Sequence, residues 1–133
     1  MSSTLSPELS ALQTKIDAGT AHIGIYGLGY VGLPLALRFA EVGLKVTGFD
    51  IDSAKVQQLN AGESYIERLQ PAVIQRAQSH GFEATTDFSL SKEVDAIIIC
   101  VPTPLNRYRE PDLSYIIATI ESALPHMRAG QLV

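Results

Sequence analysis

The stretch that decides the fold is His22-Ile23-Gly24-Ile25-Tyr26-Gly27-Leu28-Gly29-Tyr30-Val31-Gly32-Leu33-Pro34-Leu35. It opens with an apolar run that predicts a short strand, and a helical pattern begins at its last glycine. The three glycines between them, Gly27, Gly29 and Gly32, follow the spacing G-x-G-x-x-G. The first permits a tight turn, the second leaves room for a ligand beside the backbone, and the third lets the helix pack on the strand. The stretch therefore predicts a strand–turn–helix unit that can hold a dinucleotide.

An acidic residue after the next apolar segment supports this prediction. Asp50 ends the run 44–50 and lies 23 residues after Gly27. In dinucleotide-binding folds, an acid roughly 20 residues beyond the first glycine binds a ribose hydroxyl. The helix that follows the glycines adds unpaired N–H groups and a positive dipole end, which attract phosphate. We expect NAD rather than NADP, because the Asp50 carboxylate would repel an additional 2′-phosphate.

Composition limits the class of protein further. The chain has 133 residues, of which 46% are hydrophobic and 18% charged, as is typical of one globular domain. A net charge of −4 and an isoelectric point of about 5.2 argue against nucleic acid or an anionic membrane as partner. The single cysteine, Cys100, fits a reducing compartment. We therefore expect a cytoplasmic protein without nucleic-acid or membrane partners, and without a metal site, because no cluster has ligand spacing.

Strands and helices alternate along the chain. Strands are predicted at 21–26, 44–50, 82–86 and 95–101, and helices lie between them, one of them capped by Asp52 or Ser53. This alternation predicts an α/β fold with a Rossmann-type, doubly wound parallel sheet in the strand order 3-2-1-4. The fully apolar run 96–101 is expected to be buried on both faces. The glycines, Asp50 and Thr103 would then meet at the carboxyl ends of the strands.

Both ends of the chain also carry structural signals. Ser6-Pro7-Glu8 is typical of a helix start and Gly19 of a helix end, so residues 1–20 are expected to form a tail, Met1–Thr4, and a helix. Residues 21–133 are expected to form the truncated NAD-binding domain. Near the other end, Asp112 is predicted to cap a helix with an apolar face, and 131–133 to begin another strand.

Several segments resemble the UDP-glucose/GDP-mannose dehydrogenase family. Gly27-Leu28-Gly29-Tyr30-Val31-Gly32-Leu33-Pro34 resembles its opening motif. Thr85-Thr86-Asp87 and Cys100-Val101-Pro102-Thr103-Pro104 are similar to later landmarks. The segments 59–67 and 104–112 resemble the bacterial branch that oxidises UDP-N-acetylglucosamine. The resemblance covers about residues 20–133.

This resemblance implies the NAD-binding domain of an enzyme that oxidises the C6 alcohol of a UDP-sugar to a carboxylate, using two NAD⁺. The family's nucleophilic cysteine lies in a Gly-rich motif that this chain does not contain, so no catalytic residue is expected here and the chain alone should be inactive. The full-length enzyme is expected to be a homo-oligomer with a UDP-sugar substrate, serving nucleotide-sugar and polysaccharide biosynthesis. The alternatives are a non-catalytic NAD-binding module, or another dehydrogenase of the UDP-glucose or hydroxyacid type.

Resemblance also assigns individual cofactor contacts. Tyr30 and Val31 resemble positions whose backbone meets the pyrophosphate, and Asp50 and Lys55 resemble positions on the adenosine ribose. Thr103 resembles a cofactor position at the end of the fourth strand. With the three glycines, these residues form the predicted site.

Other reactive side chains are given no site role. Cys100 lies in an apolar strand, where thiols are usually inert. The three histidines are scattered and are expected to be structural or exposed. For one group of residues two interpretations stay open, contact with the substrate in the full enzyme or a place on solvated loops: Glu63, Tyr65, Glu67, Arg107 and Arg109.

Overall fold

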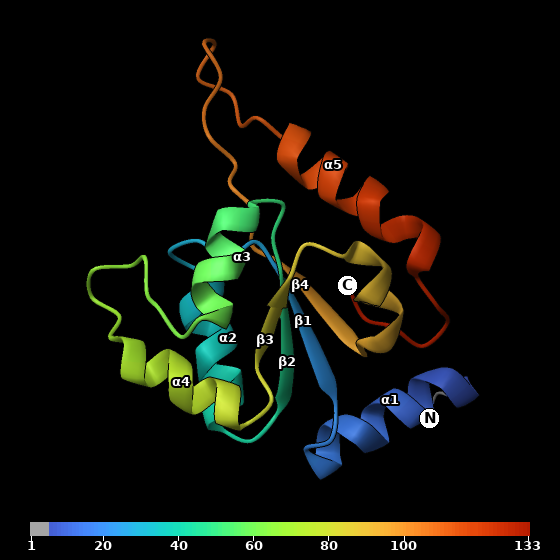
Figure 1. The fold of residues 1–133 in the computed structure, drawn as a ribbon. Helices are drawn as coiled ribbons and strands as arrows, with labels where there is room; N and C mark the ends of the chain where they lie inside the picture. Colours follow the sequence, from blue (N-terminus) through green and yellow to red (C-terminus); the bar gives the residue numbers. More distant parts are fainter. Residues whose placement is uncertain (1–5) are drawn as a thin grey trace.

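Four strands form one parallel sheet, in the order β3-β2-β1-β4 (Figure 1). The computed structural model describes residues 6–133, so the tail expected at Met1–Thr4 lies outside the described residues. The strands are β1 His22–Tyr26, β2 Lys45–Phe49, β3 Glu83–Thr85 and β4 Ala96–Ile99. β1 pairs in parallel with β2 and β4, and β2 pairs in parallel with β3. The Rossmann-type sheet and its predicted strand order are confirmed.

Helices cover both faces of this sheet (Figure 1). On one face lie α2 Gly32–Glu41, α3 Ser53–Asn60 and α4 Pro71–Ser79, and their apolar side chains form the larger core with the sheet. On the other face lie two short 3-10 helices, η1 Phe88–Glu93 and η2 Leu124–His126, together with α5 Ser114–Ala123. A smaller core there is formed by Tyr26, Phe49, Val94, Ile97 and Ala123.

Two helix starts are capped by the side chains that the sequence indicated. Before α1 Pro7–Ala18, the Ser6 hydroxyl accepts a hydrogen bond from the Leu9 N–H at 3.2 Å. Before α3, the Asp52 carboxylate accepts bonds from the N–H groups of Ala54 and Lys55, so Asp52 rather than Ser53 is the cap. Each cap satisfies N–H groups that have no partner inside the helix.

A buried carboxylate ties α1 to the sheet. Asp95 is 5% exposed and accepts hydrogen bonds from the His22 N–H at 2.8 Å, from Lys15 of α1 at 2.9 Å and from Arg128 at 2.8 Å. Burial alone would raise the pKa of Asp95, but these three donors outweigh it and lower that pKa to about 2. The carboxylate therefore stays charged and holds together the N-terminal helix, the start of β1 and the segment after η2.

The predicted burial of the fourth strand is wrong for its second half. Ala96 and Ile97 are buried, but Ile98 and Ile99 are only half-buried. Pairing with β1 ends at Ile99, opposite Tyr26, and this limits β4 to four residues. On its outer side β4 meets Leu132, which forms a parallel bridge with Ala96. The start of a further strand at 131–133 is thus confirmed, but one bridge leaves most of this edge open.

The last helix turns its larger apolar side chains outward. Its residues Thr119 and Ala123 are buried, whereas Ile117 and Ile120 are 53% and 41% exposed. The helix begins at Ser114, with Leu113 at the cap position, and Asp112 accepts a hydrogen bond from the Ser114 N–H at 3.0 Å. The apolar periodicity therefore located the helix correctly, and much of its apolar face is left exposed.

Candidate cofactor-binding site

The carboxyl ends of the strands enclose a cleft of about 700 Å³. Seven of the eight predicted cofactor residues line it, and they come from three separate segments of the chain: Gly27, Gly29, Tyr30, Val31, Asp50, Lys55 and Thr103. The eighth, Gly32, packs directly behind Gly27. A crevice at the carboxyl ends of a doubly wound sheet is where such folds bind their ligands.

The glycine turn lies against the end of β4. Gly27 has a φ of 98°, and a Cβ atom built on it would lie 2.8 Å from the carbonyl carbon and oxygen of Cys100. A Cβ on Gly32 would lie only 1.7 Å from the Gly27 carbonyl oxygen. Neither position can hold a side chain, because the backbone is left-handed at Gly27 and too closely packed at Gly32. The turn and the close helix packing predicted from the spacing are confirmed.

Gly29 differs from these two glycines. A Cβ on Gly29 would meet no atom within 4 Å, and the residue lines the cleft. The side chains of Tyr30 and Val31 are 82% and 69% exposed, so the backbone rather than the side chains can shape a binding surface there. The first helical hydrogen bond runs from the Leu33 N–H to the Gly29 carbonyl, and the N–H groups before it lack helical partners. This geometry suits a phosphate, and phosphate contact itself stays a prediction.

Asp50 links the glycine turn to the start of α3. One oxygen of its carboxylate accepts a hydrogen bond from the Leu28 N–H at 2.9 Å. The other oxygen accepts a bond from the Asp52 N–H, also at 2.9 Å. Each carboxylate oxygen has a second lone pair, so the fixed and half-buried group can still accept bonds from ribose hydroxyls. The sequence predicted the position of Asp50 but not its bond to the turn.

Tyr65 lies beneath the glycine turn. The sequence had suggested either contact with the substrate or a place on a solvated loop, and neither interpretation predicted this position. It is half-buried, and its hydroxyl donates a hydrogen bond to the Leu28 carbonyl. The ammonium of Lys55 lies 5.5 Å from the centre of the Tyr65 ring. Burial, and then the nearby carboxylates of Asp50 and Asp52, raise the pKa of Tyr65 well above its ordinary value. No spacing rule in the sequence connects Tyr65 with Leu28, and their contact appears only in the folded chain.

The rest of the cleft is lined by the 100–103 segment, Phe88 and α5. Thr103 is exposed at the cleft, and Cys100 is half-buried, with its N–H bonded to the Tyr26 carbonyl at 2.6 Å. Burial raises the pKa of the Cys100 thiol, which makes it a weak nucleophile at neutral pH. Sequence reasoning missed the contribution of α5, whose lining residues are Tyr115, Ala118, Thr119 and Ser122. Ala118, Thr119 and Ser122 among them are small, and they gave no periodic signal.

The remaining polar candidates lie on surface loops. The loop between β4 and α5 projects from the molecule (Figure 1), and Asn106 organises it by accepting bonds from the N–H groups of Tyr108 and Glu110. Arg107 lies over the Tyr108 ring at 4.9 Å and is exposed, as is Arg109. Glu63 and Glu67 are exposed as well. Their contact with a substrate stays a prediction.

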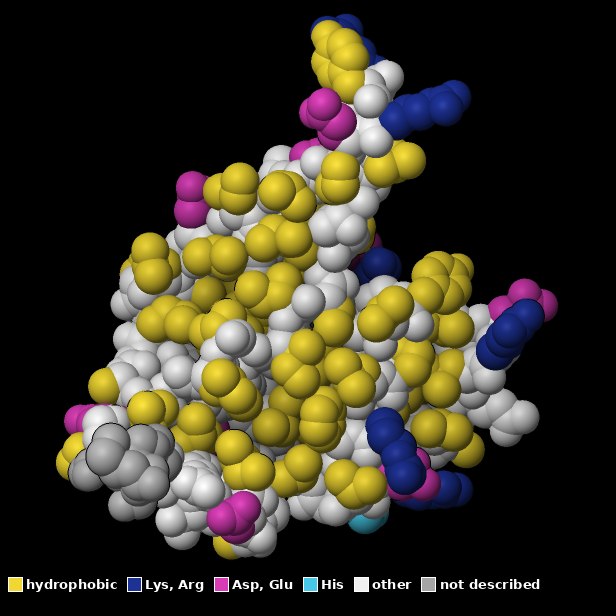
Figure 2. Space-filling view, turned by 180° about the vertical axis from the view of Figure 1, so that it is seen from behind, with side chains coloured by type: hydrophobic (Ala, Val, Ile, Leu, Met, Phe, Trp, Pro, Cys, Tyr) yellow, Lys and Arg dark blue, Asp and Glu magenta, His cyan; other side chains and the backbone are white. Residues whose placement is uncertain are grey.

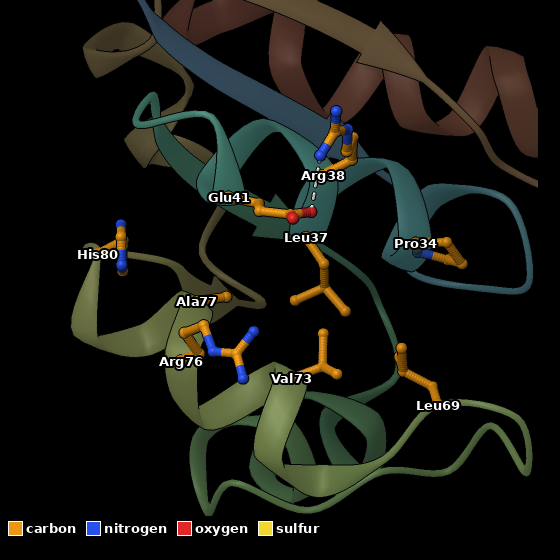
Figure 3. A pocket seen from close by; sticks show the side chains of 9 residues that line it. All are labelled: Pro34, Leu37, Arg38, Glu41, Leu69, Val73, Arg76, Ala77 and His80. Carbon is orange, nitrogen blue, oxygen red and sulfur yellow. Dashed lines mark ion pairs between the residues drawn. The ribbon is translucent and has the colours of Figure 1, made fainter.

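A second hollow, of about 350 Å³, lies between α2 and α4 (Figure 3). Its floor is apolar, with Leu37 facing Val73, and its rim holds an exposed ion pair between Arg38 and Glu41 at 2.9 Å. No predicted cofactor residue lines it. Within residues 6–133, no three His, Cys, Asp or Glu side chains gather as metal ligands would. Over the same residues, no helix has the length and apolar character needed to cross a membrane.

The parallel sheet, glycine turn and strand-end acid define a dinucleotide-binding domain of the dehydrogenase type. The chain belongs to the UDP-glucose/GDP-mannose dehydrogenase family, whose NAD binding domain matches residues 21–133. This membership confirms NAD as the cofactor. The residues around the cleft fit NAD. The cleft is large, the backbone at Gly29 is open to it, and the Asp50 carboxylate lies at the edge of the cleft.

Named relatives and solved structures agree with this family. The chain is 39% identical over 114 residues to UDP-N-acetyl-D-mannosamine dehydrogenase of Salmonella typhi, covering 84% of this chain and 26% of that protein. It is 34% identical over 111 residues to UDP-N-acetyl-D-glucosamine 6-dehydrogenase of the same organism, covering 84% and 25%. The crystal structure of NDP-N-acetyl-D-galactosaminuronic acid dehydrogenase from Methanosarcina mazei Go1 matches with a TM-score of 0.80 and 33% identity, covering 98% of this chain and 30% of that one. The chain thus spans about a quarter of the length of the curated relatives it matches.

Proposed function

We propose that this chain is the NAD-binding part of a UDP-N-acetylhexosamine 6-dehydrogenase, which oxidises the sugar C6 alcohol to a carboxylate with two NAD⁺. The observation that carries the proposal is the convergence of the glycine turn, Asp50 and Thr103 on one cleft, in a chain that matches the family's NAD binding domain. Bound NAD⁺ would accept a hydride from the sugar in each oxidation step. We also propose a cytoplasmic homo-oligomer that serves nucleotide-sugar and polysaccharide synthesis.

The chain's own residues would hold the cofactor through backbone and carboxylate contacts. The N–H groups around Gly29, Tyr30 and Val31 would receive the pyrophosphate, because they precede the first helical hydrogen bond. Asp50 would accept bonds from the adenosine ribose, with Lys55 beside it at the cleft. Thr103 would contact the cofactor from the end of β4.

The N-acetylhexosamine class is supported by the names of the relatives. Those named for N-acetylmannosamine and N-acetylglucosamine are 39% and 34% identical to this chain. The glucosamine epimer, which the segments 59–67 and 104–112 favoured, stays a prediction, because both epimers occur among these relatives.

The test is NADH formation by the full-length gene product with UDP-N-acetylglucosamine, UDP-N-acetylmannosamine and UDP-glucose. The proposal predicts two NADH for each N-acetylhexosamine oxidised, and slower turnover of UDP-glucose. A product that binds NAD⁺ but oxidises none of the three would contradict the proposed activity and favour a non-catalytic module.

A further inference from the structure

Tyr65 contacts the glycine turn but is not among the residues that line the cleft. Leu28 and Gly29 line the cleft, whereas Tyr65 packs against the larger core beneath them. Its hydroxyl donates a hydrogen bond to the Leu28 carbonyl. The contact joins residues 37 positions apart, so it forms only when the segment between α3 and α4 folds back under the turn.

Two side chains therefore hold two successive peptide units of the turn. Asp50 accepts the Leu28 N–H, which belongs to the Gly27–Leu28 peptide. Tyr65 donates to the Leu28 carbonyl, which belongs to the Leu28–Gly29 peptide. Each side chain comes from a different segment, so neither bond can compensate for loss of the other.

The orientation of the second peptide determines where the Gly29 N–H points. The peptide is trans and planar, so the Leu28 carbonyl and the Gly29 N–H point to opposite sides of the chain. Because Tyr65 packs on the larger core and holds the carbonyl, the Gly29 N–H points away from Tyr65, and Gly29 itself lines the cleft. The hydroxyl remains a donor at neutral pH, since burial and the neighbouring carboxylates raise the pKa of Tyr65.

We infer that Tyr65 is a positioning residue of the cofactor site: its hydroxyl fixes the Leu28–Gly29 peptide in the orientation that binds the NAD pyrophosphate. The inference rests on the cofactor site proposed above. Tyr65 itself contacts the turn and Lys55 and does not line the cleft. Removal of the Tyr65 hydroxyl should therefore weaken the binding of ligands that carry a pyrophosphate. The binding of ligands without a pyrophosphate should not change.

The experiment compares ADP-ribose and adenosine binding to the chain and to Tyr65→Phe, by calorimetry or NMR titration. The variant keeps the aromatic ring beside Lys55 and loses only the hydroxyl. We expect ADP-ribose and NAD⁺ to bind about fivefold more weakly, the effect of one lost hydrogen bond. Adenosine should bind as it does to the wild type.

Tyr26→Phe is the matched control. It removes another buried hydroxyl, which bonds to Ser91 in the smaller core on the opposite face of the sheet. We expect this substitution to lower the unfolding temperature without weakening the binding of ADP-ribose. A second measurement, the amide chemical shifts of Gly29 without ligand, should change in Tyr65→Phe and stay as in wild type in Tyr26→Phe, because the Gly29 amide belongs to the peptide that the Tyr65 hydroxyl holds.

Several results would overturn the inference. One such result is that Tyr65→Phe binds ADP-ribose with wild-type affinity. Another is that the variant loses affinity for adenosine as much as for ADP-ribose, because a general structural defect would affect both ligands. Unchanged Gly29 amide shifts in Tyr65→Phe would also contradict it. If the wild-type chain itself binds no NAD⁺, the cofactor site is wrong and the inference falls with it, whereas normal wild-type binding with an unaffected variant refutes Tyr65 alone.

Discussion

Asp50 is the residue that should distinguish NAD⁺ from NADP⁺. Its carboxylate is fixed by the N–H groups of Leu28 and Asp52, so it cannot turn away from a ligand. Two like charges about 4 Å apart repel by roughly 4 kcal/mol at an effective dielectric constant of 20. Lys55, also at the cleft, offsets part of this. We predict at least about tenfold tighter binding of NAD⁺ than of NADP⁺. Equal affinities in a calorimetric titration would contradict the role of Asp50.

Gly29 should be essential for binding but not for folding. A Cβ there meets no atom within 4 Å, so Gly29→Val is expected to fold and to lose NAD⁺ binding, because its side chain extends to where the pyrophosphate would lie. Gly32→Ala is the contrasting variant. Its Cβ would lie 1.7 Å from the Gly27 carbonyl, so we expect unfolding, or destabilisation by about 3 kcal/mol or more. Thermal melts and NAD⁺ titrations separate the two effects, and normal binding by Gly29→Val would refute the assignment.

At the scale of elements, Asp95 should make the attachment of α1 depend on pH. Its pKa is lowered from 3.8 to about 2, so the folded state favours the charged form. The resulting stabilisation, about 2 kcal/mol, is present above pH 4 and should be lost as the pH falls from about 4 to 2. Measured unfolding free energies should fall over this range in the wild type and less in Asp95→Asn. Parallel curves for the two proteins would show that Asp95 does not stabilise the fold.

The elements also show how far sequence reasoning extends. Strand order and helix positions followed from apolar runs, glycines and caps, because these signals are local and each predicted strand is flanked by turns. The contacts that hold the elements together were not predictable. Lys15 meets Asp95 across 80 positions and Tyr65 meets Leu28 across 37, with no spacing rule to connect them. The residues of α5 that are buried, Thr119 and Ala123, are small and gave no signal in the sequence.

At the scale of the whole molecule, the open edge of β4 should drive self-association of the isolated chain. A broad apolar surface covers the side of the molecule seen in Figure 2. Beside β4 lies a hollow of about 530 Å³ lined by apolar side chains, among them Ile98, Ile99 and Leu132. Exposed apolar patches and unpaired strand edges favour association with another chain.

Light scattering over a dilution series tests this prediction. We expect the mass to exceed that of a monomer at high concentration, and Ile120→Lys on the exposed face of α5 to reduce association if that face takes part. The alternative is that α1 covers this surface and keeps the chain monomeric, but Leu132 and Val133 remain 55% and 62% exposed. A constant mass near 14.4 kDa at every concentration would contradict the prediction.

The central claim is that NAD⁺ binds in the cleft at the carboxyl ends of the strands. It is tested most directly by titrating NAD⁺ into the isotope-labelled chain and following the backbone amide signals by NMR. The predicted result is a set of saturable shifts concentrated in residues 27–33, 50–55, 100–103 and 115–122, which belong to the segments around the cleft. Shifts centred instead on Arg76 and His80, in the hollow between α2 and α4, or no saturable shifts at all, would contradict the account.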